Sequence, residues 1–339
     1  MAPTIRDIAK IANVSTATVS RVINNDDKVK EKTAKIVRDA IAQCNYIPNN
    51  NARSLKSSSS RTIGLLISDI SNSYFSAMAK RLESELRKQG YGLSICSTDE
   101  NGQQELDNIN KFLGQQIDGL ILNTTGFNDE KIIEISKSLP VVLLERNIAA
   151  PGFVGDYVSS NNKHGMYLLT ELLLKKGHQR IGLINSGQQI STSQERYAGF
   201  WDAMMAADIN VSSSYPYIYN SETFNYKGGY EGCKHLMGLS EPPTALITTN
   251  VTLAIGALQY IRQSKIRIPE DLSFVTYGDI ENSELFFIVI GHSTLSPISA
   301  AEKASSFILS RINNPSLGNR ECVFEPSVLE NESVSVCTR

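Results

Sequence analysis

The side chains best placed for directional hydrogen bonding lie near the N-terminus, where polar residues recur at helical spacing. This polar face comprises Thr16, Ser20 and Arg21, together with the small side chain of Ala17. Hydroxyl and guanidinium groups arranged along one side of a helix can donate to base edges and to phosphates. The chemistry indicated is recognition of a nucleic acid, which points to a regulatory role and away from a catalytic one.

Three helices are expected to position this polar face. Apolar spacing predicts helices over residues 5–12, 16–23 and 31–43, with a tight turn between the first two. The residues expected to face inward are Ile5, Ile8, Ala9, Ala12, Val19, Val22, Ile23, Ile36, Val37, Ala40 and Ile41. The second helix is the one that carries the polar face.

The ends of these helices carry recognisable start signals. Thr4 and Asp7 form a capping-box pattern, and Ser15 is a suitable N-cap for the second helix. Two short helices joined by a tight turn predict a helix-turn-helix, whose second helix lies in a DNA major groove. Periodicity alone fits a small helical bundle with a solvated polar face equally well.

The charge of the chain is divided unevenly. Residues 1–61 carry eleven Lys and Arg against five Asp and Glu, a net charge of +6, and the remaining residues carry 22 against 30, a net charge of −8. The overall charge of −2 conceals this asymmetry. A basic module on an acidic body is typical of a domain that meets nucleic-acid phosphates, which favours the helix-turn-helix.

Three stretches of the N-terminal region form a specific signature. They are 14–24, 45–49 and 52–56. In these stretches, and over essentially its full length, the chain resembles the lactose and galactose repressor (LacI/GalR) family. The resemblance implies that Thr16, Ala17 and Arg21 read bases in the major groove. It also implies contacts to the DNA backbone from Thr4, Ser20, Asn24, Thr33 and Tyr46.

The segment between this region and the rest of the chain has two interpretations. Residues 49–57 are polar and lead into a run of serines, which by composition is typical of a flexible tether. The resemblance implies instead a hinge helix over residues 49–57 that orders when two copies pair in the minor groove. Leu55 then matches the wedge that kinks the duplex, and Arg53 and Lys56 flank it. A leucine without apolar periodicity around it favours the wedge.

From Arg61 onward, short apolar stretches alternate with amphipathic ones. Strands are predicted over residues 63–67, 93–96, 119–122, 141–144, 180–184, 244–248 and 273–277, and helices over 75–89, 103–113, 130–137, 165–175 and 194–206. This alternation predicts an α/β fold with parallel, doubly wound sheets and a ligand cleft at the carboxyl ends of the strands. The pattern alone fits a kinase, an oxidoreductase or a binding protein.

The resemblance narrows this choice and implies a domain organisation. A helix-turn-helix headpiece with its hinge helix occupies residues 1–60, and a bilobed core like that of the periplasmic binding proteins occupies residues 61–339. The core consists of two parallel doubly wound sheets. The chain is expected to cross between the two lobes near residues 161 and 293.

The sequence lacks the motifs of common catalytic sites. It has no GxxxxGK[ST] loop, no GxGxxG that opens a helix and no HExxH. Its five cysteines show no CxxC spacing, which predicts thiols in a reducing cytosol with neither disulfides nor a metal site. No apolar run has the length of a membrane span. We therefore expect a soluble cytoplasmic protein that is not an enzyme and uses no cofactor.

The resemblance also implies a small-molecule effector site in the core. The matching residues are Tyr74, Phe75, Glu145, Arg146, Arg196, Phe224, Asn250 and Gly278. Arg196 matches an arginine that holds effector hydroxyls or carboxylates, although by itself it reads as a solvated arginine at a helix start. Phe224 fits a stacking surface or plain core equally well.

Gly278 is the most informative departure from the family pattern, which commonly has an aspartate there. Loss of that carboxylate beside Arg196 and Arg146 predicts a more positive cleft. Because Arg pairs well with carboxylate and phosphate, we expect an anionic effector, such as gluconate, 2-keto-3-deoxygluconate or a sugar phosphate. The alternative is that Asp279 or Glu281 supplies the missing carboxylate.

Together these features predict a repressor of a carbohydrate-catabolism operon, gated by a sugar-type effector. It would bind a pseudopalindromic operator as a homodimer, and the effector would permit or forbid hinge pairing. The C-terminal residues contain no leucine heptads, which favours a dimer over a tetramer. Two alternatives remain open: a global carbon-catabolite regulator that acts with a protein corepressor, and a sugar-binding protein or enzyme without a DNA role.

Overall fold

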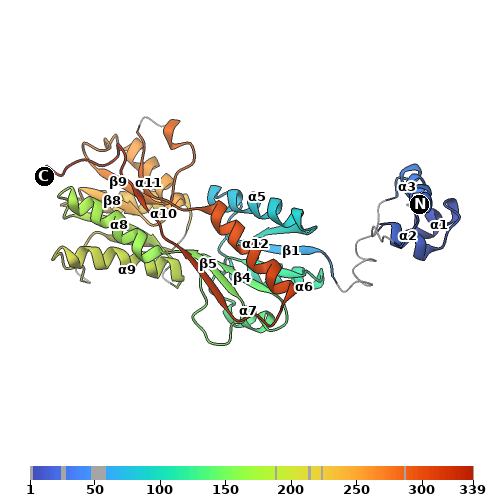
Figure 1. Cartoon of the computed structure of the whole chain (residues 1–339). Helices are drawn as coiled ribbons and strands as arrows, with labels where there is room; N and C mark the ends of the chain where they lie inside the picture. Colours follow the sequence, from blue (N-terminus) through green and yellow to red (C-terminus); the bar gives the residue numbers. More distant parts are fainter. Residues whose placement is uncertain are drawn as a thin grey trace. The chain divides into compact units, whose positions relative to one another are not determined.

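A computed structural model of the chain describes residues 3–23, 28–46, 59–187, 189–212, 215–222, 224–285 and 288–338. The chain divides into two compact units, Met1–Ser60 and Arg61–Arg339, which we call the headpiece and the core (Figure 1). Among the described residues, no helix has both the length and the apolar character required to span a membrane.

In the described part of the headpiece, three short helices pack together: α1 (Ile5–Ile11), α2 (Thr16–Ile23) and α3 (Glu31–Gln43). Their shared core comprises Ile8, Ala9, Ala12, Val19, Val22, Ala34, Val37 and Ala40. The Asp7 carboxylate accepts from the amide and the hydroxyl of Thr4, at 2.9 and 2.7 Å, and these bonds stabilise the start of α1. The Ser15 hydroxyl accepts from the Thr18 amide at 3.1 Å, as expected for an N-cap.

The inward face of α3 differs from expectation at one position. Ile36 is 45% exposed, whereas Ala34 takes a core position that the sequence analysis did not assign. The buried residues 34, 37 and 40 follow a single helical stripe, and Ile36 falls outside it. The expectation of an inward Ile36 was therefore wrong, because the angular position of a residue on the helix, and not its apolar character alone, decides whether it meets the core.

The first lobe of the core contains a six-stranded sheet of order β11-β5-β4-β3-β1-β2, in which all neighbours are parallel. Its strands are β1 (Thr62–Ile67), β2 (Gly92–Ser97), β3 (Gly119–Leu122), β4 (Val141–Leu144), β5 (Asp156–Ser160) and β11 (Arg320–Phe324). Its helices are α5 (Ser73–Lys88), α6 (Gly102–Gly114), α7 (Asp129–Ser136) and α12 (Pro297–Asn313).

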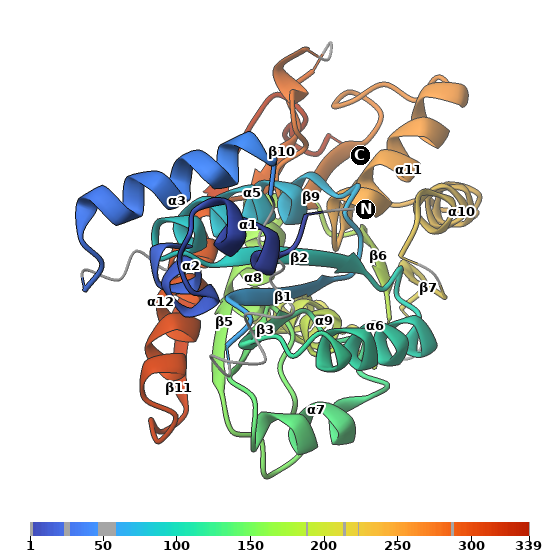
Figure 2. The same cartoon turned by 90° about the vertical axis from the view of Figure 1, so that its right-hand side faces the viewer.

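Alternation along the strands divides these helices between the two faces of the sheet. On β1, Ile63 and Leu65 pack with α5 and α12, whereas Leu66 packs with α6 and α7. Figure 2 shows the sheet between these two helical layers. A parallel sheet covered on both faces agrees with the near-continuous apolar strands of the sequence.

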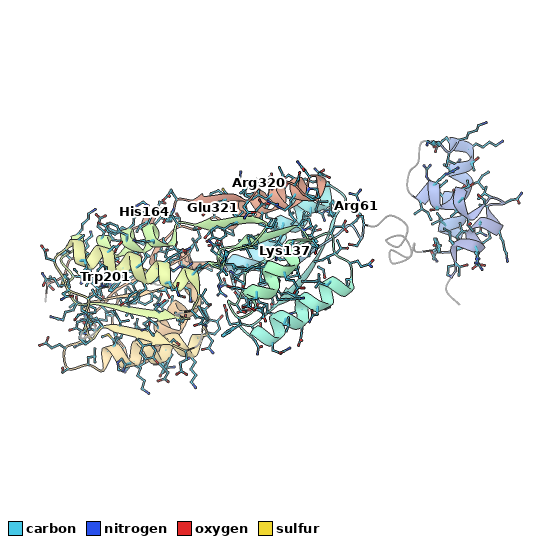
Figure 3. The ribbon with its side chains drawn as sticks, turned by 90° about the horizontal axis from the view of Figure 1, so that it is seen from below. Arg61, Lys137, His164, Trp201, Arg320 and Glu321 are labelled. Atoms are coloured by element: carbon cyan, nitrogen blue, oxygen red, sulfur yellow. The ribbon has the colours of Figure 1, made fainter. Side chains whose placement is uncertain are left out.

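The second lobe repeats this plan with a sheet of order β12-β10-β9-β8-β6-β7. Its strands are β6 (Ile181–Ser186), β7 (Ile218–Ser221), β8 (Ala245–Thr248), β9 (Ser273–Tyr277), β10 (Gly291–Ser293) and β12 (Val328–Leu329). Its helices are α8 (Asn162–Lys175), α9 (Ser191–Ala206), α10 (Tyr226–Met237), α11 (Val251–Gln263) and the short η1 (Ser283–Leu285). The pair α8 and α9 covers one face, and α10 and α11 cover the other. The only tryptophan of the sequence, Trp201, lies on α9 and provides a fluorescent reporter of this lobe (Figure 3).

The predicted fold with two parallel doubly wound sheets is confirmed, and the second sheet adds one antiparallel strand at its edge. Strand β12 pairs antiparallel with β10. It follows β11 directly, so the chain enters the second lobe from the first lobe and runs along the sheet edge in the opposite direction. An antiparallel strand at the edge of an otherwise parallel sheet is common in folds of this kind.

In the part of the core that the structure describes, the chain passes between the lobes at residue 161, at residues 294–296 and at residues 325–327. The first two crossings were expected, and the third was not. The crossings lie side by side: the Asn161 amide donates to Glu325 at 3.0 Å, and the Thr294 amide nitrogen donates to the Ser327 carbonyl at 2.7 Å. The lobes are therefore joined by adjacent connecting segments that are hydrogen-bonded to one another.

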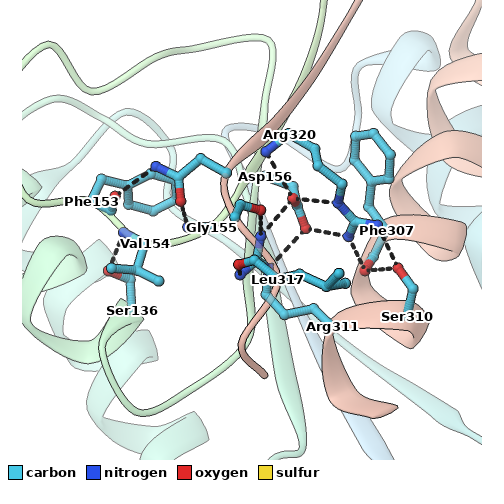
Figure 4. A network of polar contacts seen from close by, with 12 residues as sticks. Ser136, Phe153, Val154, Gly155, Asp156, Phe307, Ser310, Arg311, Leu317 and Arg320 are labelled. Atoms are coloured by element: carbon cyan, nitrogen blue, oxygen red, sulfur yellow. Dashed lines mark hydrogen bonds and ion pairs between the residues drawn. The ribbon is translucent and has the colours of Figure 1, made fainter. Parts of the chain in front are cut away.

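A buried cluster of ion pairs links strand β11 and helix α12 to strand β5 of the first lobe. Asp156 on β5 has no solvent exposure and accepts hydrogen bonds of 2.8 to 2.9 Å from Arg311 on α12 and Arg320 on β11 (Figure 4). Burial alone would raise the pKa of Asp156, but the hydrogen bonds from Arg320 and Arg311 outweigh it and hold this pKa below its usual range. Arg311 also donates to the carbonyls of Leu317 and Gly318 at 2.9 and 2.8 Å.

The substitution Asp156→Asn should lower the free energy of unfolding by about 3–5 kcal/mol, because two guanidiniums lose their shared charge partner. Urea unfolding followed by circular dichroism checks this loss. Because the folded-state pKa of Asp156 is lowered, its contribution is present above the unfolded-state pKa and is lost as the pH falls through the folded-state value. The difference between wild type and variant should therefore shrink in acid.

The matched control for this substitution is Asp202→Asn, which removes a partly exposed carboxylate paired with Lys163. An exposed ion pair contributes about 0–1 kcal/mol, so the control should unfold almost as the wild type does. Equal losses in the two variants would contradict the importance of the Asp156 cluster.

Candidate functional site

The exposed face of α2 contains the residues expected to read bases. Thr16, Ala17 and Arg21 are exposed, and Ser20 is partly exposed beside them. The capped start of α2 and the core residues Val19 and Val22 hold this face outward. The structure therefore presents the polar face of the second helix to a partner, as the major-groove interpretation requires.

The residues expected to contact the DNA backbone differ in their exposure to solvent. Thr33 and Tyr46 are partly buried, and Tyr46 packs against the headpiece core. The hydroxyl of Thr4 is committed to Asp7, and this hydrogen bond lowers the pKa of the Asp7 carboxyl. The expectations for Asn24, Arg53, Leu55 and Lys56, and for a hinge helix over residues 49–57, fall outside the described residues.

The core contains a cavity of about 610 Å³ between its two lobes. Seven of the eight expected effector residues line it: Tyr74, Phe75, Glu145, Arg146, Arg196, Phe224 and Asn250. Most of the lining follows the carboxyl ends of strands in both sheets, which is where ligands bind in open parallel sheets. Residues separated by more than 170 positions in the sequence therefore meet in one site.

Gly278 is the expected effector residue that does not line the cavity. Its backbone has φ +94°, and an added Cβ would lie 3.2 Å from Val251 and 3.3 Å from Leu295. A glycine at this position is therefore explained by backbone conformation and close packing. Asp279 and Glu281 are exposed and do not line the cavity either, so neither supplies the missing carboxylate there.

Glu145 is a buried carboxylate at the centre of the site. The hydroxyl of Tyr74 donates to it, and Ser159 donates to its carbonyl at 3.1 Å. Its backbone adopts a left-handed conformation, with φ +59°. Burial raises the pKa of Glu145, and the Tyr74 hydrogen bond and the charge of Arg196 partly oppose this rise.

Arg196 is held by neutral acceptors and an aromatic ring. Its Nε donates to Asn162 at 2.8 Å, and its Nη1 donates to the carbonyl of Thr249 at 2.8 Å. The guanidinium carbon lies 4.0 Å from the ring centre of Tyr277. These contacts bring together the first crossing, the end of β8 and the end of β9, and they aim Arg196 into the cavity.

Arg146 has a carboxylate partner that is 46 positions away in the sequence. Its Nη1 and Nη2 donate to the two carboxylate oxygens of Glu100, at 2.8 and 2.6 Å, and its side chain is 8% exposed. The guanidinium carbon lies 5.4 Å from the ring centre of Phe224 on the other lobe. Phe224 itself lies directly on Gly187, where an added Cβ would be 2.0 Å from the ring.

The charge of the lining contradicts the expected positive cleft. Five carboxylates line the cavity, against the two guanidiniums of Arg146 and Arg196. The carboxylates are those of Asp69, Asp99, Glu100, Glu145 and Glu222. Position 278 was therefore a poor guide to the electrostatics of the cleft, because acidic residues reach it from other strand ends.

Two further lining residues carry polar atoms without partners among the described residues. The Oδ1 atom of Asn123 and the hydroxyl of Tyr277 are buried, and neither has a hydrogen-bond partner. Buried polar atoms of this kind are normally satisfied, and both atoms are shielded from solvent, so neither is presented to the open cavity. Their places just after β3 and at the end of β9 are the signal that could have identified them. No group of His, Cys, Asp and Glu in the described part of the chain could hold a metal ion.

The headpiece face and the cleft together define a class of protein, a DNA-binding regulator whose core binds a small ligand. Family models support both parts. Residues 4–49 match the model described as bacterial regulatory proteins of the lacI family. Residues 60–289 match periplasmic binding proteins and the sugar binding domain of the LacI family. The chain therefore belongs to the LacI family of bacterial transcriptional regulators.

Individual relatives agree with this assignment. The chain is 33% identical to the ribose operon repressor of Haemophilus influenzae over 335 residues, 98% of each protein. It is 31% identical to the HTH-type transcriptional repressor PurR of Aliivibrio salmonicida over 333 residues, again 98% of each. The structure of the lac repressor dimer bound to operator and the anti-inducer ONPF matches with a TM-score of 0.84 and 23% identity, over 99% of this chain and 100% of that one. The protein is a DNA-binding transcriptional repressor, and it is not an enzyme.

The substitution Tyr74→Phe should lower the free energy of unfolding by about 1–3 kcal/mol at neutral pH, because the buried Glu145 carboxylate loses a donor. A carboxyl with a raised folded-state pKa is most costly to the fold at high pH, where it is charged. The loss should therefore be larger at about pH 8 than at about pH 5, as urea unfolding can measure.

The control repeats this substitution in a Glu145→Gln background. There the ionisable partner is gone, and the effect of Tyr74→Phe should no longer depend on pH. A pH dependence that persists in the double variant would show that another group is responsible.

Proposed function

We propose that a neutral, hydroxyl-rich ligand of the sugar class binds in the interlobe cleft and controls operator binding by this repressor. The observation that carries the proposal is the charge of the cavity, where five carboxylates meet two guanidiniums. Carboxylates accept hydrogen bonds from hydroxyl groups, whereas they repel an anion.

The apolar part of the lining fits the same ligand class. Phe75, Phe127 and Phe224 present aromatic rings at the cavity, which can pack on the C–H face of a sugar ring. The ribose operon repressor at 33% identity supports a pentose as the first compound to examine. A purine is the second candidate, because PurR is 31% identical and the Phe224 ring offers a stacking surface.

The anionic effector expected from the sequence has less support. That expectation rested on the loss of a carboxylate at Gly278 beside Arg196 and Arg146, but the Nη1 and Nη2 atoms of Arg146 donate to Glu100. Arg196 remains, and it stands near Glu145 and Glu195, both of which it influences electrostatically. A sugar acid or sugar phosphate would have to overcome this negative surrounding.

On the DNA side, we propose a homodimer on a pseudopalindromic operator. Each α2 helix would enter a major groove with Thr16, Ala17 and Arg21 toward the bases, and Leu55 would be a minor-groove wedge flanked by Arg53 and Lys56. The resulting affinity for DNA would respond to the ligand through the relative position of the lobes. A ligand can shift this balance only by its difference in affinity for the two states.

Fluorescence anisotropy of a labelled operator, selected from a random duplex library, tests the ligand class. Wild-type protein at fixed salt is titrated with D-ribose, neutral hexoses, guanine, hypoxanthine, gluconate and ribose 5-phosphate. A change in operator affinity with a neutral sugar supports the proposal, and a response to gluconate or ribose 5-phosphate alone would refute it. A response to purines alone selects the second candidate, and no response at all favours regulation by a protein corepressor.

The substitution Arg21→Ala should relax base preference at one operator position and weaken specific binding by about 1–3 kcal/mol, because a guanidinium can donate two hydrogen bonds to guanine. Binding to a set of single-base operator variants measures this change. Lys35→Ala is the control, since Lys35 is an exposed cation on α3 and lies outside the polar face of α2. Equal loss of base preference in both variants would refute the assignment of α2 as the recognition helix.

A further inference from the structure

Glu100 and Arg146 both line the cavity, and they form an ion pair with each other. Both terminal nitrogens of Arg146 donate to the Glu100 carboxylate, and Nη1 also donates to the carbonyl of Thr124 at 2.8 Å. This edge of the guanidinium is the one that would receive a carboxylate or phosphate in a two-bond arrangement. Glu100 therefore stands where the charged group of an anionic ligand would bind Arg146.

The backbone that presents Glu100 is itself strained. The Asn101 amide donates to the Thr98 carbonyl at 2.9 Å, and the two residues between them, Asp99 and Glu100, have φ +50° and +59°. Consecutive positive φ values favour Gly, Asn or Asp, so a glutamate in this turn is costly. Strained residues of this kind cluster at functional sites, where the strain is retained because the side chain is needed.

The remaining surface of Arg146 is directed across the cleft. Its guanidinium carbon lies 5.4 Å from the ring centre of Phe224, which belongs to the second lobe. The side chains of Arg146 and Glu100 are 8% and 22% exposed, so water screens the pair only partly. Arg146 thus contributes a flat guanidinium surface to the site, and the Glu100 carboxylate neutralises its charge.

We propose that Glu100 is a specificity-determining residue that excludes anionic ligands from the cleft by occupying the guanidinium of Arg146. This inference rests on the proposed role of the cleft as a small-ligand site. Specificity against a competitor is often achieved by repulsion or by prior occupation of its partner. Glu100 does both, since it carries negative charge and satisfies the donors that an anion would use.

The test is direct titration calorimetry of the full chain with gluconate and with ribose 5-phosphate. Glu100→Gln removes the charge and leaves one acceptor oxygen, so Arg146 regains an unneutralised charge and free donor capacity. We expect this variant to bind at least one of the two anions about tenfold more tightly than wild type does, the scale of one charge-assisted hydrogen bond. The double variant Glu100→Gln, Arg146→Met should lose this gain.

The matched control is Asp99→Asn. Asp99 precedes Glu100 in the same turn, has the same backbone conformation and lines the same cavity, but it forms no ion pair with Arg146. The Asp99→Asn substitution removes the same amount of charge without freeing the Arg146 guanidinium, so it should leave the affinity for anions near the wild-type value. An equal gain in Asp99→Asn and Glu100→Gln would refute the proposal, because net charge alone would then explain the result.

A second variant, Glu100→Gly, allows the proposal to be tested even if Glu100→Gln does not fold. Glu100→Gly removes the carboxylate and suits the positive φ, so it should fold at least as well as wild type and show the same gain in anion affinity. Absence of a gain in folded Glu100→Gln and Glu100→Gly overturns the proposal. Titration of wild type with D-ribose distinguishes this failure from failure of the proposed function, because ribose binding without an anion gain in the variants refutes only the role of Glu100.

Discussion

The parallel direction of the strands is the constraint on which the core depends. In each lobe, parallel strands deliver their carboxyl ends to one edge of the sheet, and the two edges face the same cavity. Glu100, Glu145 and Phe224 are distant in sequence, yet each follows a strand and reaches this cavity. Residues of both lobes line this cavity, so a ligand in it would contact both lobes at once.

Buried charged side chains of the core are stabilised by ion pairs and hydrogen bonds. Asp156 is neutralised by two arginines from the C-terminal part of the chain, which ties β11 to the first lobe. In the cleft, Arg146 is neutralised by Glu100, whereas Arg196 is held by neutral acceptors. The first arrangement serves stability, and the second sets the chemistry that the cavity offers to a ligand. Buried charges left without such partners would be costly in either place.

Local patterns predicted much of this structure. The helices of the headpiece, their caps at Thr4 and Ser15 and most strands of the core follow from periodicity and cap chemistry. Strands β5, β7 and β11 were missed because their polar residues obscure the apolar pattern, and β10 and β12 were missed because they are only three and two residues long. Ile36 was misassigned because composition does not define which helical face meets a neighbour. The seven cleft residues were predicted from the family resemblance, because no spacing pattern in the sequence links them.

The sequence by itself determined the class of the protein: a basic helix-turn-helix signature and a strand–helix rhythm are local properties, and they indicate a DNA-binding regulator of the LacI family. The tertiary structure alone decided the character of the cleft. Gly278 suggested a lost carboxylate, but its positive φ explains it, and Glu100 neutralises Arg146 across 46 positions. Electrostatics depends on distances in space, which residue types in sequence order do not specify.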